Sequence, residues 1–444
     1  MDLQKTVVIR EFLYGISESP RRPGPPASVT ISLSLAWDAP MPQPPVTPTE
    51  GALQAGKART ALAGFYLAGI LMSFLGSILP AWGYHLGSDF AMAGMLFLTM
   101  ALGITAAAAA ARRLIPRKGI SFVLVTASAV ACGALVYLSA VSIFLSPWWR
   151  VLGVLLIGVS FGFLISGLFY AVTAAYRHDP AATLNIAGVL FVLGSLTTAV
   201  LVSGTFYVYT VGSILFLLAL IPGFFIGMFA KTRFRRDVVR NEPGWREALH
   251  DFRSPSAVLF ALVLFFQFGN EWSIAGWLPV FLIQRIGVSP ASSLALLALY
   301  WICLLLGRVF AQHLLARVSH TRFLLLSIAA ALFGCLVLSL TKTVFGAVFG
   351  ILFVGGGFAA VYPLLVEMIG GQFPYFHPTL FNGIFSLAMT GGLLAPWTLG
   401  LFADYYGIWV LMLLPLVGTF LVFLLLLLAL LERRLSGRPA ATST

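Results

Sequence analysis

The sequence has little charge and little cysteine. Only 9% of its 444 residues are charged, whereas 59% are hydrophobic, a balance that soluble globular domains do not have. Its three cysteines, Cys132, Cys303 and Cys335, lie in apolar segments without metal-ligand spacing. The scarcity of cysteine therefore indicates neither a disulfide framework nor a zinc site, and we expect no metal and no other cofactor.

The sequence also lacks the short motifs of several enzyme classes. It contains no G-x-x-x-x-G-K-[ST], no H-E-x-x-H and no G-x-S-x-G, so neither an ATP-driven pump nor a membrane hydrolase is indicated. We expect a protein that is not an enzyme and that draws on an ion gradient or works passively. The net charge of +12 is explained by membrane topology, as the loops show, and no nucleic-acid partner is expected.

Long apolar runs fill the chain from Thr60 onward. They are near 20 residues or longer and lack the alternating pattern of a membrane barrel, which predicts an all-α polytopic membrane protein. The twelve predicted transmembrane segments are 60–83, 89–111, 119–145, 149–175, 181–203, 205–230, 256–284, 290–316, 322–341, 344–369, 378–403 and 407–431.

Positive charge alternates between the loops. With the N-terminus placed inside, only three of the 27 Lys and Arg residues fall in the outer loops, namely Arg150, Arg285 and Lys342, and one, Arg308, falls within a helix. The positive-inside rule then places both termini and the central loop in the cytoplasm. We expect a multi-pass protein of the cell membrane, in a bacterial inner membrane, that is a monomer.

The chain divides into two related halves. Shifting the sequence by 200 residues aligns Phe65 with Phe265, Gly69 with Gly269, Ser73 with Ser273, and Gly76 with Gly276. This offset predicts two pseudo-symmetric six-helix bundles with a substrate cavity between them. The predicted parts are a disordered Pro-rich cytoplasmic tail (1–57), an N-terminal bundle (58–230), a basic central loop (231–254), a C-terminal bundle (255–434) and a cytoplasmic C-terminal tail (435–444).

A polar stripe interrupts the seventh apolar segment. At helical spacing Gln267, Asn270, Glu271 and Trp277 fall on one face. A carboxylate in the middle of a membrane span is costly, so Glu271 is predicted to face a cavity and to carry a coupling proton; the alternative is a structural carboxyl bound by the neighbouring amides. Gln267 and Asn270 are predicted to bind substrate hydroxyls, and Trp272 and Trp277 to stack on the substrate, although packing or interfacial anchoring is the alternative for the tryptophans.

Further candidates lie in other segments of the C-terminal half. Tyr300, Tyr362 and Asn382 are predicted to face the cavity and bind substrate, although each residue type is more often a packing residue. Arg308 lies about 13 Å inside the cytoplasmic end of its segment and must find an anion, carbonyls or water. We predict a gating or structural ion pair for it, with Glu367 as a conceivable partner that could equally reach the interface.

These features resemble the major facilitator superfamily over residues 60 to 434. Gly269-Asn-Glu-Trp-Ser-Ile-Ala-Gly-Trp277 is similar to the seventh-helix signature of its fucose permease-like sugar:proton symporters. The resemblance implies twelve helices in two bundles and transport of a sugar with a proton. The chain departs from the superfamily pattern at Ala111, where an acid is usual, and its first and fourth segments lack the acids expected of the fucose permease, so sugar specificity and proton coupling do not carry over directly.

Together these observations predict a secondary active transporter that works by alternating access. Its partners would be a small polar organic solute, sugar or sugar-like, together with protons and the lipid bilayer. Two alternatives remain open. One is an exporter of amphipathic drugs or metabolites, and the other is a non-transporting membrane sensor or scaffold that signals through the tail and the central loop.

Overall fold

The structure is a computed structural model that describes residues 48–141, 146, 148–178, 180–234, 255–315, 318–372 and 378–435. Most of the predicted N-terminal tail, most of the central loop and nearly all of the C-terminal tail lie outside these ranges. Contacts group Ala52–Thr444 into one compact unit and Met1–Gly51 into another. All the helices except the first residues of α1 belong to the larger unit.

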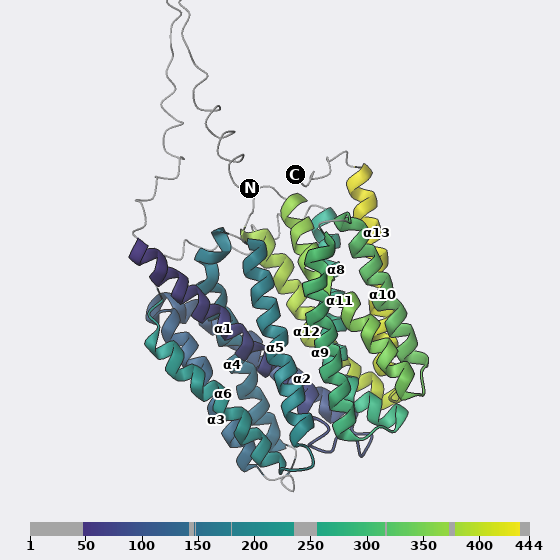
Figure 1. Cartoon of the computed structure of the whole chain (residues 1–444). Helices are drawn as coiled ribbons and strands as arrows, with labels where there is room; N and C mark the ends of the chain where they lie inside the picture. Colours follow the sequence, from purple (N-terminus) through teal and green to yellow (C-terminus); the bar gives the residue numbers. More distant parts are fainter. Residues whose placement is uncertain are drawn as a thin grey trace, which may run out of the picture. The chain divides into compact units, whose positions relative to one another are not determined.

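Twelve α-helices make up nearly all of the described residues (Figure 1). They are α1 Pro48–Ile78, α2 Phe90–Lys118, α3 Ile120–Ala140, α4 Trp148–His178, α5 Pro180–Thr205, α6 Val211–Lys231, α8 Pro255–Ile286, α9 Pro290–Leu315, α10 His320–Leu340, α11 Val344–Gln372, α12 Pro378–Tyr406 and α13 Val410–Leu435. Each predicted segment corresponds to one helix, so the all-α architecture is confirmed. Within the described ranges, eleven helices are long and apolar enough to cross a membrane, and α12 is not among them.

Several helix boundaries differ from the prediction, and two of the differences have a clear local cause. The first apolar run extends to residue 83, but α1 ends at Ile78 because Pro80 has no N–H for the helix and Gly83 has a φ of +81°. The sixth run was expected from residue 205, but α6 begins at Val211. There the Thr210 hydroxyl accepts a hydrogen bond from the Ser213 N–H at 3.3 Å, an N-cap that fixes the start.

Two sets of six helices pack in the same order. In the first set α2 packs on α4, and α3 packs on α4 and α6; in the second set α9 packs on α11, and α10 packs on α11 and α13. Gly69 of α1 and Gly269 of α8 show the same correspondence, because each lies at a close contact with the fifth helix of its own set. A Cβ added at Gly69 would overlap the Phe191 carbonyl of α5, and one added at Gly269 would lie 3.2 Å from the Ala395 Cβ of α12. The packing therefore repeats as the offset of 200 residues leads us to expect, while the division into two domains stays a prediction because contacts join all these helices in one unit.

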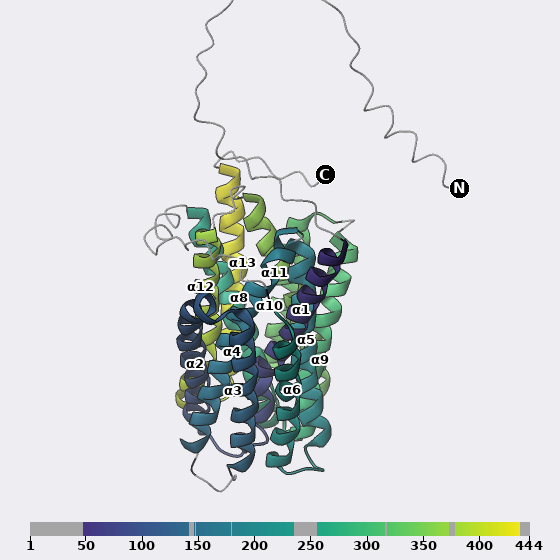
Figure 2. The same ribbon diagram turned by 90° about the vertical axis from the view of Figure 1, so that its left-hand side faces the viewer.

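The two sets meet along α2 with α12 and α5 with α9, pairs that lie side by side in both views (Figures 1 and 2). The helices α1 and α8 also touch. A Cβ added at Gly76 would lie 3.1 Å from the Cα of Gly276, the residue exactly one repeat offset away in the sequence. Glycine at position 76 permits this close backbone approach, whereas the space that a side chain at Gly276 would need is filled by the Phe97 ring of α2.

Hydrogen bonds close one end of the interface between the sets. This end, here called the Ile78 end, contains the end of α1 and the start of α2. The Gln284 amide of α8 donates to the carbonyls of His85 (3.2 Å) and Gly87 (2.7 Å) in the loop between α1 and α2. The Asp404 carboxylate of α12 accepts from the Ala91 N–H at 3.3 Å, and the Ser203 hydroxyl of α5 donates to the Ala291 carbonyl of α9 at 2.8 Å.

Candidate functional site

Polar side chains from three helices gather around Glu271. Glu271 and Gln267 lie one turn apart on α8, and the Glu271 carboxylate interacts electrostatically with Arg308 of α9. Arg308 in turn interacts with Tyr300 of α9 and Tyr362 of α11. We call these five residues the polar cluster. The structure therefore brings together five residues that the sequence singled out, from α8, α9 and α11.

The polar cluster contains buried groups without hydrogen-bond partners. Within the described part of the chain, this holds for both polar atoms of the Gln267 amide, the Tyr300 hydroxyl and the Arg308 Nε. Gln267 lies beside the Glu271 carboxylate, but without a hydrogen bond of ordinary geometry. A buried polar group without a hydrogen-bond partner lowers the stability of the protein by about 1–3 kcal/mol. Several unpartnered groups in one place are therefore expected where a solute or water binds.

Glu271 and Arg308 interact through space. The described residues include no direct ion pair between them, but the positive charge of Arg308 favours the ionised form of Glu271, and an ionised Glu271 favours the charged form of Arg308. Part of the Glu271 surface remains accessible to solvent, while Arg308 is buried with 9% exposure. A carboxyl near a buried cation can exchange a proton when water reaches it, because the cation shifts the balance between its neutral and ionised forms.

Asn270 and Trp277 point away from the polar cluster. The Asn270 amide donates to the Thr419 hydroxyl of α13 at 3.3 Å. The Trp277 N–H donates to the Pro396 carbonyl of α12 at 2.8 Å, and its ring lies 5.4 Å from the ring of Phe97. Both side chains therefore have packing partners. Their predicted substrate contacts stay predictions to which the geometry adds no support.

Aromatic rings adjoin the cluster at Tyr362, which is linked through Phe268 to Trp272. The Trp272 ring packs on Gly392 of α12 and lies 5.9 Å from the ring of Phe268. Phe268 also makes an edge-to-face contact with Tyr362, with ring centroids 5.4 Å apart. The side chain of Asn382, also predicted to bind substrate, lies outside the described residues.

Arg308 and Glu367 do not pair with each other. A Cβ added at Gly188 of α5 would overlap Nη1 of Arg308, so the guanidinium lies against the first set of helices. The Glu367 side chain is 60% exposed, and its Oε1 lies 3.3 Å from Nε2 of His320 of α10. The conceivable Arg308–Glu367 pair is thus replaced by two separate interactions, because Glu367 faces the surface and Arg308 faces the interior.

A small central cavity lies between the two sets of helices. Its volume is about 30 Å³, enough for one or two water molecules but not for a sugar. The lining residues are Met72, Phe97, Met100, Ala101, Ile104, Phe191, Trp272, Ala275, Gly276, Trp301, Gly392, Leu393 and Pro396. In this state the cavity is nearly closed, as expected when the Ile78 end is joined by hydrogen bonds.

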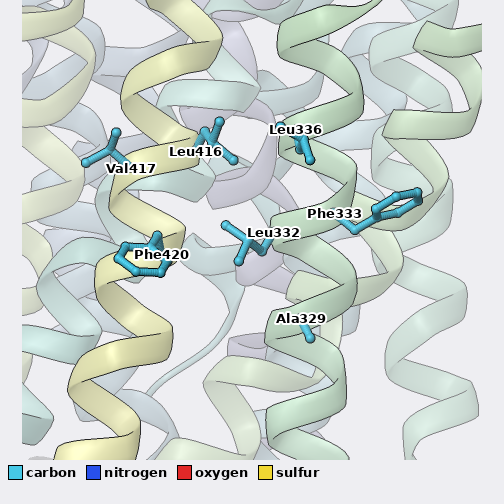
Figure 3. Close-up of a pocket in the computed structure, with 7 residues that line it drawn as sticks. All are labelled: Ala329, Leu332, Phe333, Leu336, Leu416, Val417 and Phe420. Carbon is cyan, nitrogen blue, oxygen red and sulfur yellow. The ribbon is translucent and has the colours of Figure 1, made fainter.

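A larger groove of about 500 Å³ lies on the outside of the second set, between α10 and α13. Figure 3 shows Leu332 and Leu416 pointing into the space between these two helices. Its lining residues, Ala329, Leu332, Phe333, Leu336, Leu416, Val417 and Phe420, are all apolar. The groove has no side-chain group that could recognise a polar solute, so it is not the candidate site. Within the described ranges, no three His, Cys, Asp or Glu side chains gather as a metal site requires.

Residues of the loop between α1 and α2 contact Arg150 of α4, an arrangement that the sequence did not predict. The Arg150 Nη1 donates to the Trp82 carbonyl at 3.5 Å, and its guanidinium lies 5.2 Å from the Trp82 ring and 5.8 Å from the Tyr84 ring. Burial lowers the pKa of His85, an effect opposed by a hydrogen bond to the Pro80 backbone. Burial raises the pKa of Tyr84, opposed by Arg150.

Comparison with known proteins identifies the fold. Residues 181–392 match the model of the Major Facilitator Superfamily, which describes transporters and not enzymes. No curated protein matches the sequence.

Solved structures match most of the chain. A variant of the E. coli fucose:proton symporter FucP is 13% identical with a TM-score of 0.59, covering 85% of this chain and 99% of that one. The nucleoside transporter NupG is 13% identical with a TM-score of 0.61, covering 85% and 98%. A D-xylose-proton symporter is 14% identical with a TM-score of 0.65, covering 82% and 96%. At these identities the matches show the fold.

Proposed function

We propose that this chain, a secondary transporter with the Major Facilitator Superfamily fold, carries a small polar organic solute by alternating access and couples it to protons through Glu271. The observation that carries the proposal is the position of Glu271 in the polar cluster. It is an acid inside a membrane-spanning helix, beside Arg308 and beside hydrogen-bonding groups that lack partners. Intramembrane acids in such surroundings mark proton and substrate pathways.

The coupling follows from electrostatics. In an interior of low dielectric, a nearby cation strongly favours the ionised carboxylate, and its withdrawal favours the protonated acid. Arg308 belongs to α9 but lies against Gly188 of α5, so its position depends on how the two sets of helices sit together. Movement of the sets would therefore alter the charge interaction that governs whether Glu271 keeps its proton.

Alternating access is supported by the hydrogen bonds at the Ile78 end. Under the predicted topology this end faces outward, so the structure is a state closed to the outside. Opening would break the bonds that Gln284, Asp404 and Ser203 make across the interface. Each of these bonds joins a side chain to a main-chain group, and each is worth about 0.5–1.5 kcal/mol, which is small enough for reversible opening.

The solute class rests on the unpartnered groups and on the relatives. An amide, a phenol and a guanidinium offer both donors and acceptors, which suit the hydroxyls of a sugar or a sugar-like compound. The structural relatives named above include transporters of fucose, xylose and nucleosides. Each of these solutes contains a hydroxylated ring. The expected location is the cell membrane of a bacterium, with both termini in the cytoplasm.

The test uses purified protein in sealed vesicles that contain a pH-sensitive dye. L-fucose, D-xylose and uridine are added outside, and solute uptake and lumen pH are followed together. We expect at least one solute to enter and the lumen to acidify with it. Uptake without a pH change would contradict proton coupling, and the absence of uptake for all three would contradict this solute class.

An exporter of amphipathic compounds is the second candidate function. The observation that favours it is the central cavity, whose lining includes Phe97, Phe191, Trp272 and Trp301. Expression in a host without its own drug pumps distinguishes the two functions. Raised resistance to amphipathic drugs, with no uptake of the three solutes, would favour the exporter.

A further inference from the structure

The two walls of the central cavity differ in chemistry. The first set of helices contributes Met72, Phe97, Met100, Ala101, Ile104 and Phe191, none of which has a side-chain hydrogen-bonding group of ordinary strength. The second set contributes two indoles, those of Trp272 and Trp301, among small and apolar residues. A solute in this cavity would therefore meet an apolar surface on one side and aromatic rings on the other.

Trp301, which lines this cavity, carries a buried hydrogen-bond donor. Its side chain is only 2% exposed, and its Nε1–H has no partner within the described part of the chain. The hydroxyl of the preceding residue, Tyr300, is also buried without a partner there. Buried tryptophan and tyrosine usually find a partner for these groups, so the Trp301 N–H lacks an acceptor that a ligand could provide.

The methionines explain which kind of group fits the first wall. Methionine side chains are flexible and polarisable, and their sulfur atoms make favourable contacts with aromatic rings. Met72 and Met100 come from α1 and α2 and line the cavity that Trp272 and Trp301 line from α8 and α9. A flat aromatic ring between them would meet sulfur on one face and indole on the other, whereas sugar hydroxyls against the methionines would find no partner.

We propose that the transported solute is amphipathic, with a planar aromatic or heteroaromatic group that lies between Met72 and Met100 on one wall and Trp301 on the other, and with an acceptor atom that takes the Trp301 N–H. The proposal rests on the proposed function, because it names the substrate class of the same transport path. The more polar part of the solute would lie toward Gln267 and Glu271, on the second set of helices.

The experiment measures binding to the full chain in detergent by isothermal titration, with matched probes. Phenyl β-D-glucopyranoside is compared with D-glucose, and adenosine with D-ribose. We expect the aromatic member of at least one pair to bind at least tenfold more tightly than its plain sugar. Equal or tighter binding of both plain sugars would overturn the proposal, as would the failure of every probe to bind.

Three variants then locate the aromatic group. Trp301→Phe keeps an aromatic ring at this position but removes the donor, and should weaken the binding of the aromatic probe about fivefold to tenfold. Met100→Gln and Met72→Gln keep the length but make the first wall polar, and each should reduce the preference for the aromatic probe. The control is Met95→Gln, the same change on α2 at a side chain that is 38% exposed and does not line the cavity.

The thermal stability of each variant is measured together with its affinity. If Met100→Gln does not fold, the affinity of Met72→Gln tests the first wall instead, because Met72 is only half-buried. Unchanged affinities for Trp301→Phe and for the folded methionine variant would overturn the proposal. The proposed function is tested separately. A plain sugar that binds and enters vesicles would overturn the proposal of an amphipathic solute but would agree with the proposed transport function.

Discussion

The guanidinium of Arg308 lies against the backbone of Gly188, in the place that a side chain at position 188 would occupy. Arg308 and Gly188 belong to different sets of helices, α9 and α5, which form one of the main contacts between the sets. Arg308 also interacts with Glu271. A single glycine thus allows the cation that neighbours the proposed proton carrier to reach across the interface.

Gly188→Ala should disturb transport more than stability. Its methyl group would overlap Nη1 of Arg308, so the guanidinium would have to shift, and we expect solute turnover to slow about tenfold, a cost comparable to overpacking. The measurement is the initial rate of solute counterflow in vesicles. Gly204→Ala is the matched control, because it lies on the same helix and a Cβ there meets nothing within 4 Å. Equal rates for the two variants would contradict the role of Gly188.

Gln284→Ala should favour opening at the Ile78 end. It removes the two hydrogen bonds to the carbonyls of His85 and Gly87, which together correspond to roughly a tenfold shift between the closed and open states. Spin labels on cysteines at Leu86 and Tyr405, which are 82% and 84% exposed, report the distance across this end. We expect a larger population of long distances.

The control for this change is Ser289→Ala. The Ser289 hydroxyl bonds only locally with Ser292 at 2.8 Å in the described structure, and does not join the two sets of helices. A distance distribution that is the same for Gln284→Ala and for Ser289→Ala would show that the amide does not hold this end closed.

Asn270→Ala should affect stability rather than substrate affinity. Asn270 is 6% exposed and bonds to Thr419 of α13, so its loss should cost about 1–2 kcal/mol and lower the Tm. Titration of the transported solute should give an unchanged Kd. A Kd raised tenfold with an unchanged Tm would instead support the substrate contact that the sequence predicted for Asn270.

Acidification should destabilise the loop between α1 and α2. Burial lowers the pKa of His85 below its ordinary value, so the unfolded chain binds a proton at a higher pH than the folded protein does. The stability contributed by neutral His85 is present above about pH 6.5 and is lost as the pH falls below it. The change in Tm between pH 7.5 and pH 5.5 should be smaller in His85→Gln, and an equal change in both proteins would assign the effect to another group.

Local patterns predict the helices well, because apolar runs and prolines act within one segment. They also identify Glu271, since an acid within such a run is conspicuous. Neighbours from distant segments are harder to predict. The sequence places Asn270 on the same stripe as Glu271, but the packing of α13 on α8 gives it Thr419 as a partner. The hydrogen bonds of Gln284 were not predicted because every residue has a main-chain carbonyl, so the sequence does not indicate which carbonyls accept them. The Arg308–Gly188 contact was not predicted because it depends on how α9 packs against α5.

The central claim is that Glu271 carries the coupling proton, and the most direct test separates accumulation from exchange. Vesicles containing Glu271→Gln are loaded with the solute identified by the uptake screen, and both pH-driven accumulation and solute counterflow are measured. Glu367→Gln serves as the control, because that acid is exposed and lies beside His320. We predict that Glu271→Gln abolishes accumulation but keeps counterflow, whereas the control keeps both. Accumulation by Glu271→Gln at the level of the unmodified protein would contradict the account.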